Sequence, residues 1–155
     1  MLKQVYSILA FTLMVILSGN AQTVQAGLTS SGTNLIISAK PDQAINVTFA
    51  AGNVTITWPN SYGVTLGSIT NTVGTWTLND NGTSGGTDYA NFACINAPAP
   101  TINWGSGSTN ELFSVAVNQR DAIPYMGDFT LSNNIPDAGG NWYFETGAGS
   151  FKETF

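Results

Sequence analysis

Apolar and polar residues alternate with a period of two along most of this chain, which is the pattern of strands with one buried side. No segment after residue 26 shows a convincing helical spacing of apolar residues. Clusters of Gly, Asn, Asp, Ser and Pro separate the alternating segments, as turns do. The pattern predicts an all-β fold: one antiparallel β-sandwich domain over residues 27–155, of jelly-roll or immunoglobulin-like type, with about nine to ten strands.

The segment Ile45–Trp58 illustrates the pattern. The apolar residues of Ile45–Phe49 share one face, and so do those of Val54–Trp58, while Ala51 and Gly52 between them form a turn signal. We therefore predict a β-hairpin with one buried side. Trp58 and Trp76 alternate with Thr neighbours, which predicts that both indoles face the core.

The N-terminus has the features of an export signal. Lys3 precedes an apolar run, Val5–Leu17, which is too short to span a bilayer comfortably and is followed by small and polar residues. We therefore expect residues 1–26 to act as a signal peptide, and the mature protein to be secreted, on the cell surface or periplasmic, with no membrane insertion after cleavage. Two triplets fit the small-x-small rule, so that the mature chain would begin at Gln22 or at Gly27: Gly19-Asn20-Ala21 and Val24-Gln25-Ala26.

Charge excludes one class of partner. Charged residues make up only 8% of the chain, and without Lys3 three cations remain against nine carboxylates. Such a surface repels phosphate backbones and offers no basic patch from which counterions would be released, so nucleic-acid binding is not expected.

The chain contains no histidine and one cysteine. The lack of histidine removes Ser-His-Asp and Cys-His catalysis and the usual zinc and copper sites, which favours a protein that is not an enzyme. Cys94 lies in an apolar run between Ala93 and Ile95 and is predicted to be a buried, unreactive thiol.

Calcium is the one cofactor that the sequence suggests. The stretch 79–88 is rich in Asn, Asp, Gly and Thr and is predicted to be a loop, and Asp80, Asn81 and Asp88 are its candidate metal ligands. The spacing differs from an EF-hand, since no Glu closes the loop. A plain hairpin connection is the alternative interpretation.

Aromatic residues beside turn signals are the candidate ligand-binding residues. Exposed Trp and Tyr rings stack on sugars, whereas buried ones pack in the core. Four rings lie near predicted loops and are assigned to ligand binding, with core packing as the alternative: Trp104, Tyr125, Trp142 and Tyr143.

Residues 45–117 resemble the cohesin-like and carbohydrate-binding-module-like sandwiches of secreted bacterial surface proteins. The resemblance is carried by a strand with an aromatic pair, a short strand, a strand led by Leu and Phe, and two Trp-containing strands: Tyr89–Phe92, Ile102–Trp104, Glu111–Val115, Ile56–Pro59 and Gly74–Trp76. It implies adhesion, scaffolding or glycan contact.

These observations favour an exported, non-catalytic module that acts through a binding surface in cell-surface adhesion or extracellular assembly, with an extracellular protein or glycan as partner. Two alternatives stay open. One is a calcium-dependent carbohydrate-binding module that uses the 79–88 stretch. The other is a small glycan-cleaving enzyme with a pair of carboxylates.

Overall fold

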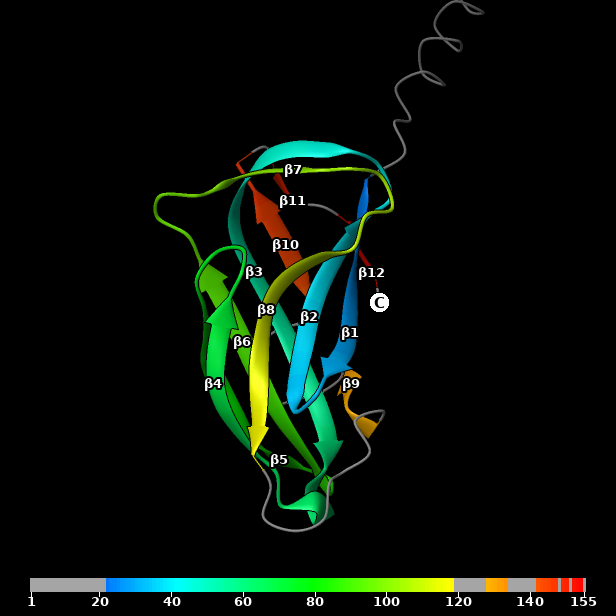
Figure 1. Ribbon diagram of the computed structural model, residues 1–155, viewed down its shortest axis with the longest axis vertical. Helices are drawn as coiled ribbons and strands as arrows, with labels where there is room; N and C mark the ends of the chain where they lie inside the picture. The colour runs from blue at the N-terminus through cyan, green and yellow to red at the C-terminus, as the bar shows by residue number, and fades with distance from the viewer. Residues whose placement is uncertain (1–21, 119–127, 134–141, 148, 151, 155) are drawn as a thin grey trace, which may run out of the picture.

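The computed structural model describes residues 22–118, 128–133, 142–147, 149–150 and 152–154. Two mainly antiparallel β-sheets pack against each other, which confirms the predicted β-sandwich (Figure 1). Among the described residues, no helix is long and apolar enough to cross a membrane. The strands are β1 Thr23–Ser31, β2 Asn34–Pro41, β3 Ile45–Pro59, β4 Thr65–Asn71, β5 Trp76–Ser84, β6 Thr87–Ile95, β7 Thr101–Trp104, β8 Asn110–Asn118, β9 Thr130–Leu131, β10 Tyr143–Thr146, β11 Gly149–Ser150 and β12 Lys152–Thr154.

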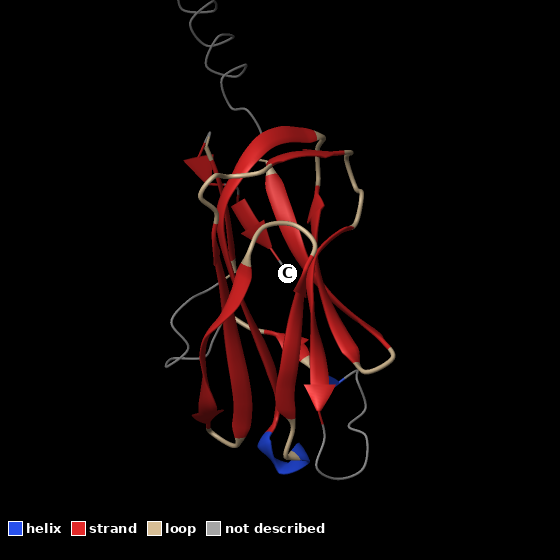
Figure 2. Ribbon diagram, turned by 60° about the vertical axis from the view of Figure 1, so that its left-hand side comes forward, coloured by secondary structure: helices blue, strands red, loops and turns tan. Residues whose placement is uncertain are grey.

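The first sheet has the order β12-β1-β2-β8-β4, and the second has the order β11-β10-β3-β6-β5, with β7 and β9 also paired to β3. All strand pairs are antiparallel except β1 and β12, which run parallel. Figure 2 shows the layers from another side, with the single-turn helix η1 (Asn60–Tyr62) at one end. The two sheets therefore expose their outer sides and bury the sides that face each other.

Aromatic residues fill much of the space between the sheets. Phe49 stacks on Phe144 with ring centroids 4.5 Å apart, and Trp76 stacks on Phe113 at 4.9 Å. Trp58 and Trp76 are 5% and 1% exposed, so the prediction that both face the core is confirmed. We call the connected rings the aromatic cluster: Phe49, Trp76, Phe92, Trp104, Phe113, Trp142 and Phe144.

The predicted hairpin at Ile45–Trp58 is wrong, because this segment is one strand, β3. The register with β10 passes from Ala51 to Phe49, so Ala50 is an extra residue in the ladder and the alternation changes phase there. Gly52 does not form a turn. A Cβ on this residue would lie 2.7 Å from the Trp76 ring, so Gly52 is the residue that lets the ring pack against the backbone.

The first strand begins before the expected domain boundary at Gly27. β1 starts at Thr23, and Val24 and Ala26 are buried in the core. Residues 23–26 therefore belong to the fold, although they were assigned to the signal peptide.

Candidate functional site

The side of the second sheet that faces away from the core is called here the outer face. Side chains alternate along a strand, and the buried Phe92 and Phe144 show which positions point inward. The strand register then gives three rows that run across β10, β3, β6 and β5: Glu145, Ala51 and Ile95; Tyr143, Asn53, Ala93 and Thr77; Thr55, Asn91 and Asp80.

Amide side chains hold the middle of the outer face together. Asn91 is fully buried, and its Nδ2 donates to Asn53 Oδ1 at 2.7 Å and to Thr55 Oγ1 at 2.9 Å. Its Oδ1 accepts from Asn53 Nδ2 at 3.2 Å and from Asn79 Nδ2 at 3.1 Å. Because each hydrogen bond crosses from one strand to another, the network fixes β3, β5 and β6 relative to each other.

One end of the outer face is apolar and acidic. Ile95 is 80% exposed, and in the described part of the chain only it and Leu78 are exposed large hydrophobic residues. Ile95 lies opposite Ala51, and Ala51 lies opposite the exposed Glu145, so the two side chains are about 10 Å apart at two strand spacings. This end thus presents an apolar group beside a carboxylate.

Tyr143 lies next to Glu145 on the same side of β10 and is half-buried. Burial, followed by the nearby carboxylate of Glu145, raises the pKa of its phenol, so the hydroxyl stays protonated at neutral pH. Tyr143 can therefore donate a hydrogen bond while part of its ring remains accessible.

The candidate calcium ligands do not lie in a loop. Residues 79–88 form the far half of the β5–β6 hairpin, which turns at Gly85 and Gly86 with φ of 58° and 84°. Positive φ at both positions matches the tight turn that such a hairpin requires, and glycine adopts it without strain. The Gly and Asn content that predicted a loop is therefore explained by one turn and one bulge in β5.

The pleat separates the two candidate aspartates. Asp80 lies on the outer face, where it accepts hydrogen bonds from Tyr89 Oη at 3.3 Å and from the Asn81 backbone N–H at 2.8 Å. Asp88 lies on the opposite side of the hairpin and accepts from Thr83 Oγ1 at 2.5 Å. Among the described residues, no group of three or more His, Cys, Asp or Glu could hold a metal ion. The structure thus does not bring Asp80, Asn81 and Asp88 together as one set of ligands.

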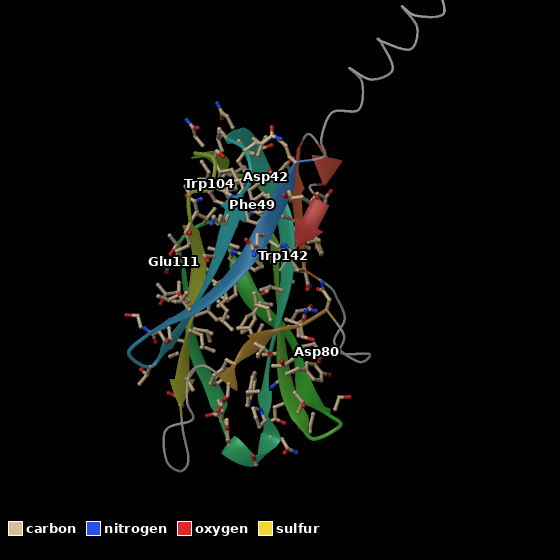
Figure 3. All side chains as sticks on the ribbon, turned by 90° about the vertical axis from the view of Figure 1, so that its right-hand side faces the viewer. Asp42, Phe49, Asp80, Trp104, Glu111 and Trp142 are labelled. Atoms are coloured by element: carbon tan, nitrogen blue, oxygen red, sulfur yellow. The ribbon has the colours of Figure 1, made fainter. Side chains whose placement is uncertain are left out.

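Two of the four candidate ligand-binding rings are core residues. Trp142 is 1% exposed and its Nε1 donates to the Val24 carbonyl at 3.0 Å, while Trp104 is 8% exposed and packs on Phe144. Neither ring leaves a face open for stacking on a sugar. Tyr143 lies on the outer face, and Tyr125 lies outside the described residues. Figure 3 also shows Trp104 and Asp80 toward opposite ends of the long axis.

Cys94 is buried as predicted, at 1% exposure. Burial raises the pKa of its thiol, and Sγ lies 3.3 Å from Asn96 Oδ1. A buried, protonated thiol is a poor nucleophile.

Trp58 borders a hollow of about 170 Å³ at the open side of the sandwich, between β4 and β5. Val64, Leu66 and Leu78 provide most of its apolar lining. Trp58 Nε1 is buried and finds no hydrogen-bond partner in the described structure. This region is therefore packed less completely than the aromatic cluster.

Sequence reasoning missed the outer face. Tyr89, Asn91, Ala93 and Ile95 occupy one side of β6, while Ala90, Phe92 and Cys94 occupy the other. Both sides look apolar in sequence, so alternation alone does not reveal which side is exposed. The signal that could have pointed outward is the amide of Asn91 between apolar neighbours.

Comparison of the chain with protein-family models, with curated proteins and with solved structures finds no match.

Proposed function

We propose that this protein is an exported, non-catalytic binding module that contacts an extracellular protein through the outer face, in cell-surface adhesion or extracellular assembly. The observation that carries the proposal is Ile95, a large apolar side chain that is 80% exposed in the middle of a structured sheet edge rather than in a loop. Exposed apolar groups within a rigid surface are typical of contact sites between proteins.

The chemistry around Ile95 favours a protein over a glycan. Ala51 and Ala93 extend the apolar area, whereas Tyr143 is the sole half-exposed aromatic ring among the residues that make up the three rows. A sugar would be bound by several open aromatic rings, and Trp104 and Trp142 are buried.

The charge of the outer face narrows the kind of partner. Its rows contain Asp80 and Glu145 and no Lys or Arg. A partner surface with an apolar pocket for Ile95 and a basic group for Glu145 would complement it, and the basic group would also speed association. The amide network below the rows keeps the face in one shape, so little ordering entropy is lost on binding.

Binding to the surface of the cells that export the protein tests the proposal. Labelled exported protein is applied to these cells at increasing concentration, and Ile95→Ser is compared with wild type. We expect a dissociation constant about tenfold higher for Ile95→Ser, as for a contact residue near the centre of an interface. Leu78→Ser is the matched control, because Leu78 is also exposed but points to the other side of the sheet.

Treatment of the cells identifies the class of partner. A protein partner is lost when surface proteins are digested and survives periodate oxidation of sugars. Loss after periodate alone, or equal binding by Ile95→Ser and wild type, would contradict the proposal. Binding that needs calcium would instead support the carbohydrate-binding alternative.

A further inference from the structure

We infer that export cleaves this chain after Ala21, so that the mature protein begins at Gln22 and keeps β1 complete. The inference rests on the export signal predicted from the sequence and is independent of the proposed function. Both Gly19-Asn20-Ala21 and Val24-Gln25-Ala26 fit the sequence rule for cleavage, and the two products differ by five residues, 22–26. The fold shows what those residues do.

The start of β1 is held by hydrogen bonds that a cut after Ala26 would remove. The Thr23 backbone N–H donates to Asp42 Oδ1 at 3.0 Å, and the Asp42 backbone N–H donates to the Thr23 carbonyl at 3.0 Å. The hydrogen bonds of Thr23 also hold the pKa of the Asp42 carboxyl below its usual range. Asp42 and Thr23 therefore form a reciprocal clasp where β1 begins.

Val24 ties the same strand to the core. Its side chain is fully buried, as is most of Ala26. Its carbonyl accepts a hydrogen bond from Trp142 Nε1, which joins residues 118 positions apart in the sequence. Without Val24 the Trp142 indole N–H would lose its acceptor in a buried place, which is one of the costly changes in a folded protein.

Residues 23–25 also lie between two other strands. On one side Val24, Gln25 and Ala26 pair with Pro41, Lys40 and Ala39 of β2. On the other side Thr23, Val24 and Gln25 pair with Lys152, Glu153 and Thr154, which are all of β12. Figure 1 shows β12 beside β1 at this edge of the sheet. A cut after Ala26 would leave β12 without its partner in the first sheet, whereas a cut after Ala21 leaves a single residue, Gln22, ahead of an intact strand.

The N-terminus and mass of the exported wild-type protein test the inference. We expect the sequence to begin Gln22-Thr23-Val24. A terminus at Gly27 would overturn the inference, and so would an intact Met1 terminus in the membrane fraction.

Two single substitutions sharpen the test. Ala21→Arg places a large cation directly before the cleaved bond and should abolish the Gln22 product, while Asn20→Gln changes the unconstrained middle position and should leave it unchanged. If Ala21→Arg diverts cleavage to Gly27, that product should melt about 10 °C or more below wild type, or be degraded. A Gln22 product from Ala21→Arg, or a Gly27 product as stable as wild type, would contradict the inference.

Discussion

Two buried tryptophans, Trp142 and Trp58, have different surroundings. Trp142 contacts the Phe144 ring and donates its indole N–H to the Val24 carbonyl. Trp58 packs against Phe129 with centroids 5.5 Å apart, borders the hollow between β4 and β5, and leaves its N–H unpaired within the described structure. Equal burial thus does not mean equal stabilisation, because packing and hydrogen-bond satisfaction are local properties.

The largest difference should appear when a ring is truncated. Phe144→Ala removes a ring that contacts Phe49, Trp104 and Trp142, and we expect it to lower the free energy of unfolding by about 3–5 kcal/mol. Phe129→Ala removes one ring contact and should cost less. Denaturant unfolding of both variants measures the difference. Equal losses would show that the two regions are packed alike.

The two indole nitrogens provide a finer comparison. Trp142→Phe removes a satisfied donor and leaves the Val24 carbonyl with one partner fewer, so we expect a loss of about 1–3 kcal/mol. Trp58→Phe removes a donor that lacks a partner and should cost clearly less. The test is chemical denaturation of each variant against wild type. A larger loss for Trp58→Phe would mean that the unpaired N–H does not weaken this region.

The smallest expected effect is a pH dependence that differs between the regions. Cys94 lies opposite Trp76 of the aromatic cluster, and burial raises the pKa of its thiol above the usual 9.0. The unfolded chain therefore loses this proton first as pH rises, so the stability from the neutral thiol is complete below about pH 9 and declines above it. Melting temperatures of wild type and Cys94→Ala at pH 7–10 measure this decline.

The control for the pH effect is Tyr62, which follows β3 near Trp58. Its hydrogen bond to Asp128 raises the pKa of the phenol above the usual 10.0, so its contribution declines only at higher pH. Tyr62→Phe should leave the decline that begins near pH 9 in place, whereas Cys94→Ala should remove it. The same decline in Cys94→Ala would assign it to other groups.

Alternation predicted most strands because it reflects a local requirement, that one side of each strand faces the core. It failed at Ala50-Ala51-Gly52, where the sequence of a turn serves a bulge and a close approach to Trp76. It also failed at 79–88, where Asn, Asp and Gly form strand, bulge and a tight turn. Small and polar residues meet both needs, so composition cannot distinguish them.

The candidate site was harder to predict than the fold. Proximity to turn signals selected Trp104 and Trp142, yet both rings pack against Phe144 from distant strands. No local pattern indicates that a residue at a strand end lies beneath another strand. Ile95 was missed for the opposite reason, because an isoleucine in an apolar run is normally buried.

The sequence by itself determined the fold class, the inward orientation of Trp58 and Trp76 and the burial of Cys94, because all three follow from side-chain alternation within single strands. Only the tertiary structure decided that Asp80 and Asp88 lie on opposite sides of a hairpin and that Asn53 and Asn91 share one network. It also decided that Val24 supports Trp142. The physical reason is that register between strands is set by the global packing of both sheets, which no segment of sequence contains alone.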